Sequence, residues 1–120
     1  MILLVDDDHA ITQVLKELLS REGYDVCIAG NGEDAYTILK EKSCRGMLLD
    51  MLMPGINGAG LLMLLAADGI SVPVIVMAGS PDFTAEELQD LPGVVGVLKK
   101  PFYPEEALSM VRRLMPLAKT

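Results

Sequence analysis

The stretch GMLLDMLMPGING, residues 46–58, decides how the rest of the chain can fold. Its apolar residues 47–49 end at a carboxylate, Asp50, and a Pro-Gly and an Asn-Gly pair then break the chain into a loop. A continuous apolar run bounded by turn residues is typical of a strand buried on both faces. Asp50 would then lie at the carboxyl end of that strand, the edge where open α/β sheets build ligand sites. Taken alone, the pattern favours a plainer role for Asp50, in starting a turn or capping the next helix.

Two more apolar runs end in charged residues, and they favour a ligand-site role for Asp50 over a turn or cap. Residues 2–5 (ILLV) run into three aspartates at 6–8, and residues 94–98 (VVGVL) run into two lysines and a proline. If the three runs are neighbouring parallel strands, their carboxyl ends meet at one edge and gather four charged side chains: Asp6, Asp7, Asp50 and Lys100. A helix-capping cluster would use one of the three acids and leave two unexplained.

This ordered set resembles the receiver domain of two-component response regulators. The matching pieces cover nearly the whole chain: VDDD at 5–8, LLDMLMPGING at 48–58, VPVIVMAGS at 72–80 and VLKKPF at 97–102. The resemblance implies an α/β fold, a flavodoxin-like doubly wound five-stranded parallel sheet of order 2-1-3-4-5 with five helices. We expect residues 1–120 to form a single receiver domain.

The apolar pattern itself predicts strands and helices in alternation, and therefore a parallel sheet covered on both faces. The expected strands are 2–6, 24–29, 46–50, 72–78 and 94–98. The expected helices follow Asp8, span about 32–42, 58–68 and 84–91, and begin at Pro104. The first helix carries a stripe that we expect to be buried, formed by Ile11, Val14, Leu15, Leu18 and Leu19. The helix at 58–68 is apolar all round, either because it is well covered or because part of it faces a partner.

Length and charge limit the classes of function. A chain of 120 residues, 51% of them hydrophobic, suits one domain with a substantial core. The net charge of −7 argues against nucleic-acid binding by this segment, because phosphate neutralisation needs clustered Lys and Arg. Residues 47–67 are long enough to cross a membrane, but Asp50, Pro54 and several glycines favour strand, loop and helix instead. Two cysteines without a CxxC motif, and a strand directly after Met1, favour a reduced, cytoplasmic protein.

The charged residues suit phosphoryl transfer. A carboxylate can attack an activated phosphoryl group to form an acyl phosphate, and this chemistry depends mainly on positioning and charge neutralisation. Carboxylates about 4 Å apart repel by roughly 4 kcal/mol per pair at a surface-like dielectric constant, which a bound cation relieves. An all-oxygen ligand set favours Mg²⁺, or Mn²⁺ in its place.

The receiver resemblance implies a role for each of these residues. Asp50 is the phosphoacceptor, and the donor is a histidine kinase or phosphotransfer protein. Asp7 and Asp50 bind the metal directly, Asp6 acts through water, and the backbone carbonyl of Leu52 adds a further ligand. Lys100 pairs with the phosphoryl oxygens, and its peptide bond to proline is cis. The module is no enzyme beyond catalysing its own phosphorylation and dephosphorylation, and its other partner is an output domain or a downstream protein. We expect a monomer or weak dimer.

The chain departs from the family pattern at two switch positions. Where the family has Thr or Ser at the end of the fourth strand, this chain has Ala78, and where it usually has an aromatic residue before the lysine, it has Val97. Ser80 is a candidate to supply the missing hydroxyl. Asn57 replaces a common Asp, and both suit a turn. His9 is expected to start a surface helix rather than to bind metal.

Two rival functions stay open. A pseudo-receiver, which is an interaction module independent of phosphorylation, is favoured by Ala78 and Val97 and disfavoured by the intact acids and lysine. A haloacid-dehalogenase-like phosphatase would need the pattern D-x-D-x-T/V near residue 6, which DDDHA at 6–10 fits poorly.

Overall fold

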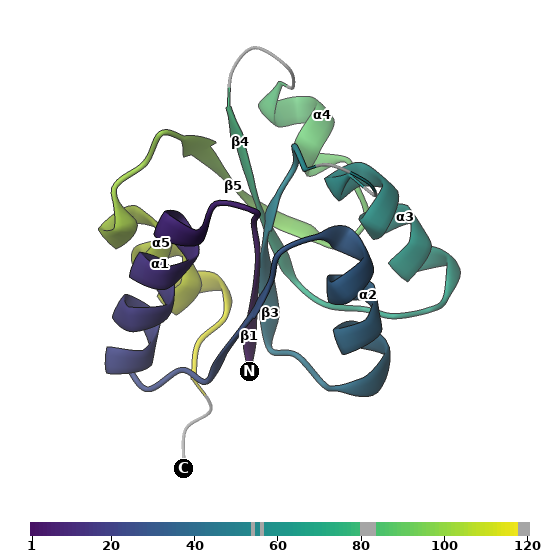
Figure 1. Ribbon diagram of the computed structural model, residues 1–120. Coiled ribbons are helices and arrows are strands. Elements are labelled where there is room, and N and C mark those ends of the chain that lie inside the picture. Colours follow the sequence, from purple (N-terminus) through teal and green to yellow (C-terminus); the bar gives the residue numbers. More distant parts are fainter. Residues whose placement is uncertain (54, 56, 80–83, 118–120) are drawn as a thin grey trace.

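The computed structural model describes residues 1–53, 55, 57–79 and 84–117, whose strands and helices alternate along the chain (Figure 1). The strands are β1 (Ile2–Val5), β2 (Val26–Ala29), β3 (Gly46–Asp50), β4 (Val74–Gly79) and β5 (Val94–Lys100). The helices are α1 (His9–Arg21), α2 (Gly32–Glu41), α3 (Gly58–Ala67), α4 (Ala85–Gln89) and α5 (Pro104–Leu114). All the strand pairs are parallel, in the order β2-β1-β3-β4-β5. The predicted fold class, strand order and helices are therefore confirmed.

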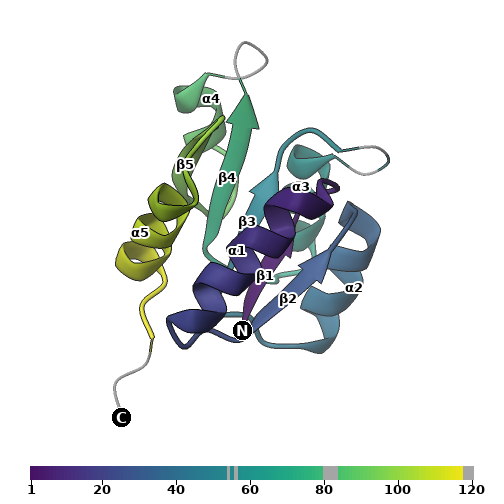
Figure 2. The same ribbon diagram turned by 60° about the vertical axis from the view of Figure 1, so that its left-hand side comes forward.

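The helices cover the sheet in two layers. Helices α1 and α5 lie on one face, and α2, α3 and α4 lie on the other (Figures 1 and 2). This arrangement buries every residue of β1 and β3 and most of β4, which explains why these strands read as unbroken apolar runs. Strand β2 occupies an edge of the sheet and is only partly buried.

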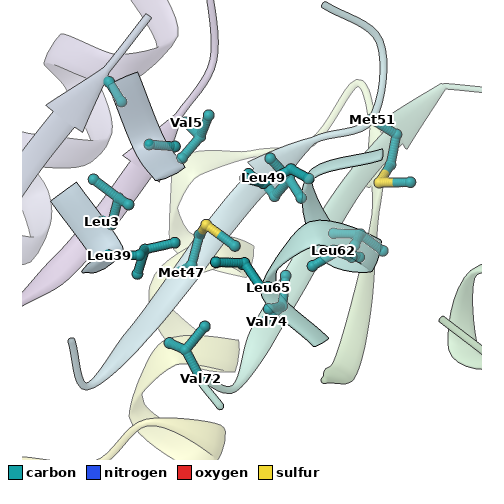
Figure 3. Packing of buried hydrophobic residues seen from close by; sticks show 14 of the residues in the cluster. Leu3, Val5, Leu39, Met47, Leu49, Met51, Leu62, Leu65, Val72 and Val74 are labelled. Atoms are coloured by element: carbon teal, nitrogen blue, oxygen red, sulfur yellow. The ribbon is translucent and has the colours of Figure 1, made fainter. Parts of the chain in front are cut away.

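Each face of the sheet has its own apolar core. Under α1 and α5, Leu15 and Leu19 pack against Leu4 and Ile75. On the opposite face, leucines of α2 and α3 pack over β1, β3 and β4, as Figure 3 shows for Leu39, Met47, Leu49, Leu62 and Leu65. Burying one such side chain contributes about 1.5–3 kcal/mol, so these two layers hold the strand ends in a fixed relation.

Side-chain caps fix where four of the helices begin. The Asp8 carboxylate accepts hydrogen bonds from the backbone N–H groups of Ala10 (2.9 Å) and Ile11 (3.3 Å), as its predicted capping role requires. Asn31 caps α2, Asn57 caps α3 by accepting from the Gly60 N–H at 2.8 Å, and Thr84 caps α4. Each cap satisfies a backbone donor that the helix leaves unpaired, which contributes about 1 kcal/mol.

Some boundaries and burials differ from those predicted. Strand β4 begins later and β5 runs on through Lys100, because its backbone stays paired with β4 as far as Gly79. Helix α4 is shorter than expected. The prediction that Val14 is buried is wrong: it is 48% exposed, because it lines an open groove with Phe102 and Pro104.

Three further sequence predictions can be compared with the structure. Cys27 and Cys44 are free thiols, as expected. Part of α3 faces outward, since Met63 is 57% exposed. Within the described ranges, no helix combines the length and apolar character needed to cross a membrane.

Candidate functional site

The strand register brings the predicted charged residues to one edge of the sheet. Asp50 is the last residue of β3, and Asp6 directly follows β1, where Val5 is paired with Leu49. Lys100 is the last residue of β5 and pairs with Gly79 of β4. Gly79 lies two residues after Met77, which pairs with Asp50 of β3. These carboxyl ends lie at the top of the sheet in Figure 1. The meeting of the ends of β1, β3 and β5 at one edge was expected, although β4 lies between β3 and β5. The length of β5 was not expected.

Lys100 bridges two buried carboxylates. Its Nζ lies 2.9 Å from Asp6 Oδ2 and 3.4 Å from Asp50 Oδ2. The other oxygen of each acid is held by backbone, because Asp6 Oδ1 accepts from the Asp8 N–H (3.0 Å) and Asp50 Oδ1 accepts from the Leu52 N–H (3.1 Å). Asp6 is only 2% exposed and Asp50 only 6%. Each carboxylate therefore presents its Oδ2 to the lysine in a fixed orientation.

Burial dominates the electrostatics of Asp50. It raises the pKa of the Asp50 carboxyl, and repulsion from Asp6 raises it further, while the Leu52 N–H and Lys100 act in the opposite direction. For Lys100, burial works to lower the pKa, but the hydrogen bond and charge of Asp6, together with Asp50, raise it overall. Lys100 is thus stabilised in its cationic form, whereas burial disfavours the ionised form of Asp50 beside it.

Three acids form a group that fits a hard cation. Asp6, Asp7 and Asp50 each offer one carboxylate oxygen, and these oxygens all lie within 4.8 Å of one another. Asp7 is exposed, so it can supply a ligand from the solvent side. Oxygen donors in this number suit Mg²⁺, which keeps several waters when bound by one or two carboxylates. His9 is not a member of this group, in agreement with its predicted role at the start of α1.

Two contacts in the site were not foreseen from the sequence. We expected Lys100 to pair with the phosphoryl oxygens and did not foresee its contact with Asp6, which is shorter than its contact with Asp50. The restraint of Asp50 by the Leu52 N–H was also missed, although an Asp that ends a strand often accepts from the residue two positions on. The peptide bond between Lys100 and Pro101 is cis, as predicted.

The two departing positions lie close to this edge. Ala78 is buried in β4 opposite Lys99, and it has no hydroxyl to offer. Val97 is paired with Val76 and packs against the core beneath α2, α3 and α4. Ser80, the candidate substitute for the missing hydroxyl, lies outside the described residues.

The chain belongs to the response regulator receiver domain family, whose model matches residues 2–112. It is 34% identical over 111 residues to the DNA-binding response regulator MtrA of Mycobacterium tuberculosis (strain ATCC 25618 / H37Rv), covering 92% of this chain and 48% of that protein. It is 33% identical over 115 residues to the response regulator MprA of Mycolicibacterium vanbaalenii, covering 95% of this chain and 49% of that protein. The chain thus spans about half the length of the curated relatives it matches.

Solved structures agree with this assignment. The receiver domain of the Francisella response regulator 1452 matches with a TM-score of 0.84 and 30% identity, over 95% of this chain and 94% of that one. A CheY-like receiver domain protein from Methanospirillum hungatei JF-1 matches with a TM-score of 0.83 and 25% identity, over 95% of this chain and 92% of that one. The chain is therefore a receiver domain of the response regulator class, and nothing in these matches favours the phosphatase alternative.

Proposed function

We propose that Asp50 is the residue of this receiver domain that accepts the phosphoryl group. The observation that carries the proposal is the pairing of Asp50 with Lys100, 3.4 Å apart, beside the Asp6 and Asp7 carboxylates. Asp50 Oδ1 is engaged by the Leu52 N–H, which leaves Oδ2 as the nucleophile.

The transfer follows from these contacts. Asp50 Oδ2 attacks the phosphorus of a phosphohistidine, an oxygen–phosphorus bond forms, and the phosphorus–nitrogen bond breaks. The electron pair leaves with the donor imidazole, which takes up a proton from solvent. Lys100 exchanges part of its contact with Asp6 for the incoming phosphoryl oxygens, acting as a point charge. A Mg²⁺ or Mn²⁺ ion held by Asp7, Asp50 and the Leu52 carbonyl, with Asp6 through water, would neutralise further charge on the transferred group.

A histidine kinase or a phosphotransfer protein is the proposed donor. An apolar groove runs beside Lys100, lined by residues of α1 and of the segment after β5, including Ile11, Val14 and Phe102. Lys100 contacts both this groove and Asp50, so an apolar donor surface resting there would carry its phosphohistidine to the acceptor. In this reaction the domain accepts a phosphoryl group on Asp50 and does not turn over a separate substrate.

A pseudo-receiver is the second candidate, and Ala78 is the observation that favours it. The hydroxyl that the family places at this position is absent, and Val97 lacks the ring that usually moves with it. A module of this kind would bind its partners equally well whether or not Asp50 carried phosphate.

Mass spectrometry after incubation with acetyl phosphate and Mg²⁺ distinguishes the two candidates. We expect one phosphate adduct that is absent from Asp50→Asn, weaker in Asp7→Ala and lost when the metal is chelated. The matched control is Asp25→Asn, which removes an exposed acid away from the site and should leave the adduct unchanged. An adduct that persists in Asp50→Asn refutes the assignment, and the absence of any adduct favours the pseudo-receiver.

A further inference from the structure

The net charge of the chain is concentrated in one part of its sequence. Residues 46–98 contain no Lys, Arg or His but hold six of the 17 acids, which gives this segment a formal charge of −6. The other 67 residues hold 11 acids and 10 bases, a net charge of −1. This segment forms β3, α3, β4, α4 and most of β5, so it includes two helices that lie on the same face of the sheet (Figure 1).

An apolar groove lies at the end of α3. It has a volume of about 270 Å³, and its lining comes from the end of α3, residues 69–74, and the turn before β5: Leu62, Leu65, Ala66, Ile70, Pro92 and Gly93. For comparison, a cavity of about 150 Å³ holds a benzene molecule. The groove therefore has room for a leucine or an aromatic side chain.

Helix α4 is short beside the strand that it covers. With five residues it is about 7.5 Å long, whereas the six residues of β4 extend for about 20 Å. Helix α4 thus covers only part of this face, where it buries Leu88. Beside the groove, Met63 shares a face of α3 with Ala66, three residues later, and extends the apolar surface outward.

Unpaired acids lie on α4 and directly after it, in the segment that leads to Pro92 and Gly93 of the groove. Glu86, Glu87 and Asp90 are exposed, and in the described part of the chain none of them pairs with a basic side chain. On the α2 side the situation differs, because Asp68 accepts a hydrogen bond from the Tyr36 hydroxyl and Lys40 lies 5.1 Å from the Tyr36 ring centroid. The unpaired acids of this face therefore lie on α4 and at Asp90, directly after it.

We propose that this α3–α4 face is a docking surface for a basic amphipathic helix of a partner protein. One apolar side chain of the partner enters the groove beside Ala66, and its Lys or Arg residues lie against Glu86, Glu87 and Asp90. Recognition of a groove by an amphipathic helix places apolar anchors at i and i+4 with charged residues along the border. Complementary charges also steer the encounter and exclude like-charged competitors.

The same charge distribution argues against other occupants. A second copy of this chain would bring an equally acidic face against this one, and the repulsion would oppose contact. Nucleic acids and anionic membranes carry phosphate charges that the face repels as well. Because none of these contacts involves Asp50, the docking proposal stands independently of phosphorylation.

The test uses the unphosphorylated, metal-free protein and a fluorescent synthetic helical peptide with leucines along one face and lysines beside them. We expect saturable binding by fluorescence anisotropy, with backbone NMR shifts confined to residues 62–72 and 85–94. A peptide with alanines in place of the leucines, and one with glutamates in place of the lysines, should each bind at least about tenfold more weakly. Absence of binding, binding by the alanine peptide at full strength, or shifts centred on α1 overturns the proposal.

Matched variants of the protein separate specific docking from general attraction. Glu86→Gln, Glu87→Gln and Asp90→Asn together should weaken binding at least about fivefold, whereas three exposed acids elsewhere, changed as Asp25→Asn, Glu41→Gln and Glu105→Gln, should change it less than about twofold. Ala66→Gln should obstruct the groove, and Ala67→Gln, on the next exposed position of α3, should not. Equal effects of the two triple variants overturn the proposal, as does a self-associated dimer, seen by sedimentation, that protects this face.

Discussion

Replacing Asp50 with Asn should make the metal-free protein more stable, which is unusual for a change at a buried site. The substitution keeps the size of the side chain and an oxygen that can accept from the Leu52 N–H. It removes a charge whose burial raises the pKa of the Asp50 carboxyl. The ion pair between Lys100 and Asp6, at 2.9 Å, remains in place.

The distances give the size of the effect. The Asp50 carboxylate lies within 4.8 Å of both Asp6 and Asp7, and each such pair repels by about 3.5 kcal/mol at an effective dielectric constant of about 20. Attraction to Lys100 at 3.4 Å offsets about 5 kcal/mol of this. Burial adds to the repulsive side, and solvent screening at the exposed Asp7 reduces it. We therefore expect a gain of about 1–2 kcal/mol in unfolding free energy, or about 3–8 °C in melting temperature.

Thermal and urea unfolding of both proteins, with chelator present, measures this gain. Because the pKa of Asp50 is higher in the folded chain than in the unfolded chain, its ionised form destabilises the fold above the folded-state pKa. That cost disappears as the pH falls through the folded-state pKa, so the difference between the two proteins should be largest near neutral pH and shrink on acidification. A control variant, Asp25→Asn, should change stability by less than about 0.5 kcal/mol.

Magnesium should reverse the order of stability. A ligand that binds only the folded state at about 100 times its Kd adds about 2.7 kcal/mol, and the parent protein should gain far more of this than Asp50→Asn. The reasoning is refuted if Asp50→Asn is less stable than the parent by 1 kcal/mol or more without metal, because attraction to Lys100 would then outweigh repulsion and burial.

Three further predictions concern the lifetime of the phosphate, the packing of the sheet and the transmission of the signal. Leu52 is 52% exposed two residues after Asp50 and cannot orient an attacking water, so Leu52→Glu should shorten the acyl-phosphate half-life by about tenfold and Leu52→Ala should change it little, as followed on phosphate-affinity gels; equal half-lives for all three proteins would count against this role. Gly46→Ala should cost about 1–3 kcal/mol of stability by overpacking, since its Cβ would clash with the side chain of Met115, which is buried and has little room to move, whereas Gly30→Ala, with nothing within 4 Å, should cost little; equal melting temperatures would contradict this packing. The double change Ala78→Thr and Val97→Tyr should increase the NMR shifts that a phosphoryl mimic on Asp50 produces across residues 84–98; shifts that are already as large in the parent would show that the relay needs neither side chain.

Much of the fold and site could be predicted because each signal was local. The apolar runs at 2–5 and 46–49 identify strands that are covered on both faces, and turn residues bound them. Asp8, Asn57 and Thr84 mark helix starts through short-range hydrogen bonds that need no tertiary information. The gathering of the acids with Lys100 followed from the assumption that the three strands are parallel neighbours, and it holds although β4 lies between β3 and β5.

The remaining features depend on contacts between distant parts of the chain. Strand β5 reaches Lys100 because β4 offers backbone partners as far as Gly79, which no local pattern reveals. Val14 fits the buried stripe of α1 by periodicity, but the groove that exposes it depends on Phe102. The preference of Lys100 for Asp6 over Asp50 depends on side-chain distances of half an ångström or so, which spacing along the sequence cannot resolve.

The start of α3 offers a route from Asp50 to the α3–α4 face that avoids Ala78 and Val97. Gly58, the first residue of α3, packs against the backbone that follows the acceptor: a Cβ added there would lie 2.9 Å from the Met51 Cα and 3.2 Å from the Asp50 carbonyl oxygen. Met51 is buried, so a displacement of this backbone on phosphorylation has little free space and must move α3. We expect the phosphoryl mimic to shift the NMR signals of residues 58–67 in the parent protein, and to shift them as strongly in the Ala78→Thr, Val97→Tyr variant. Unchanged signals across α3 in both proteins would exclude this route and leave the docking face insensitive to phosphate.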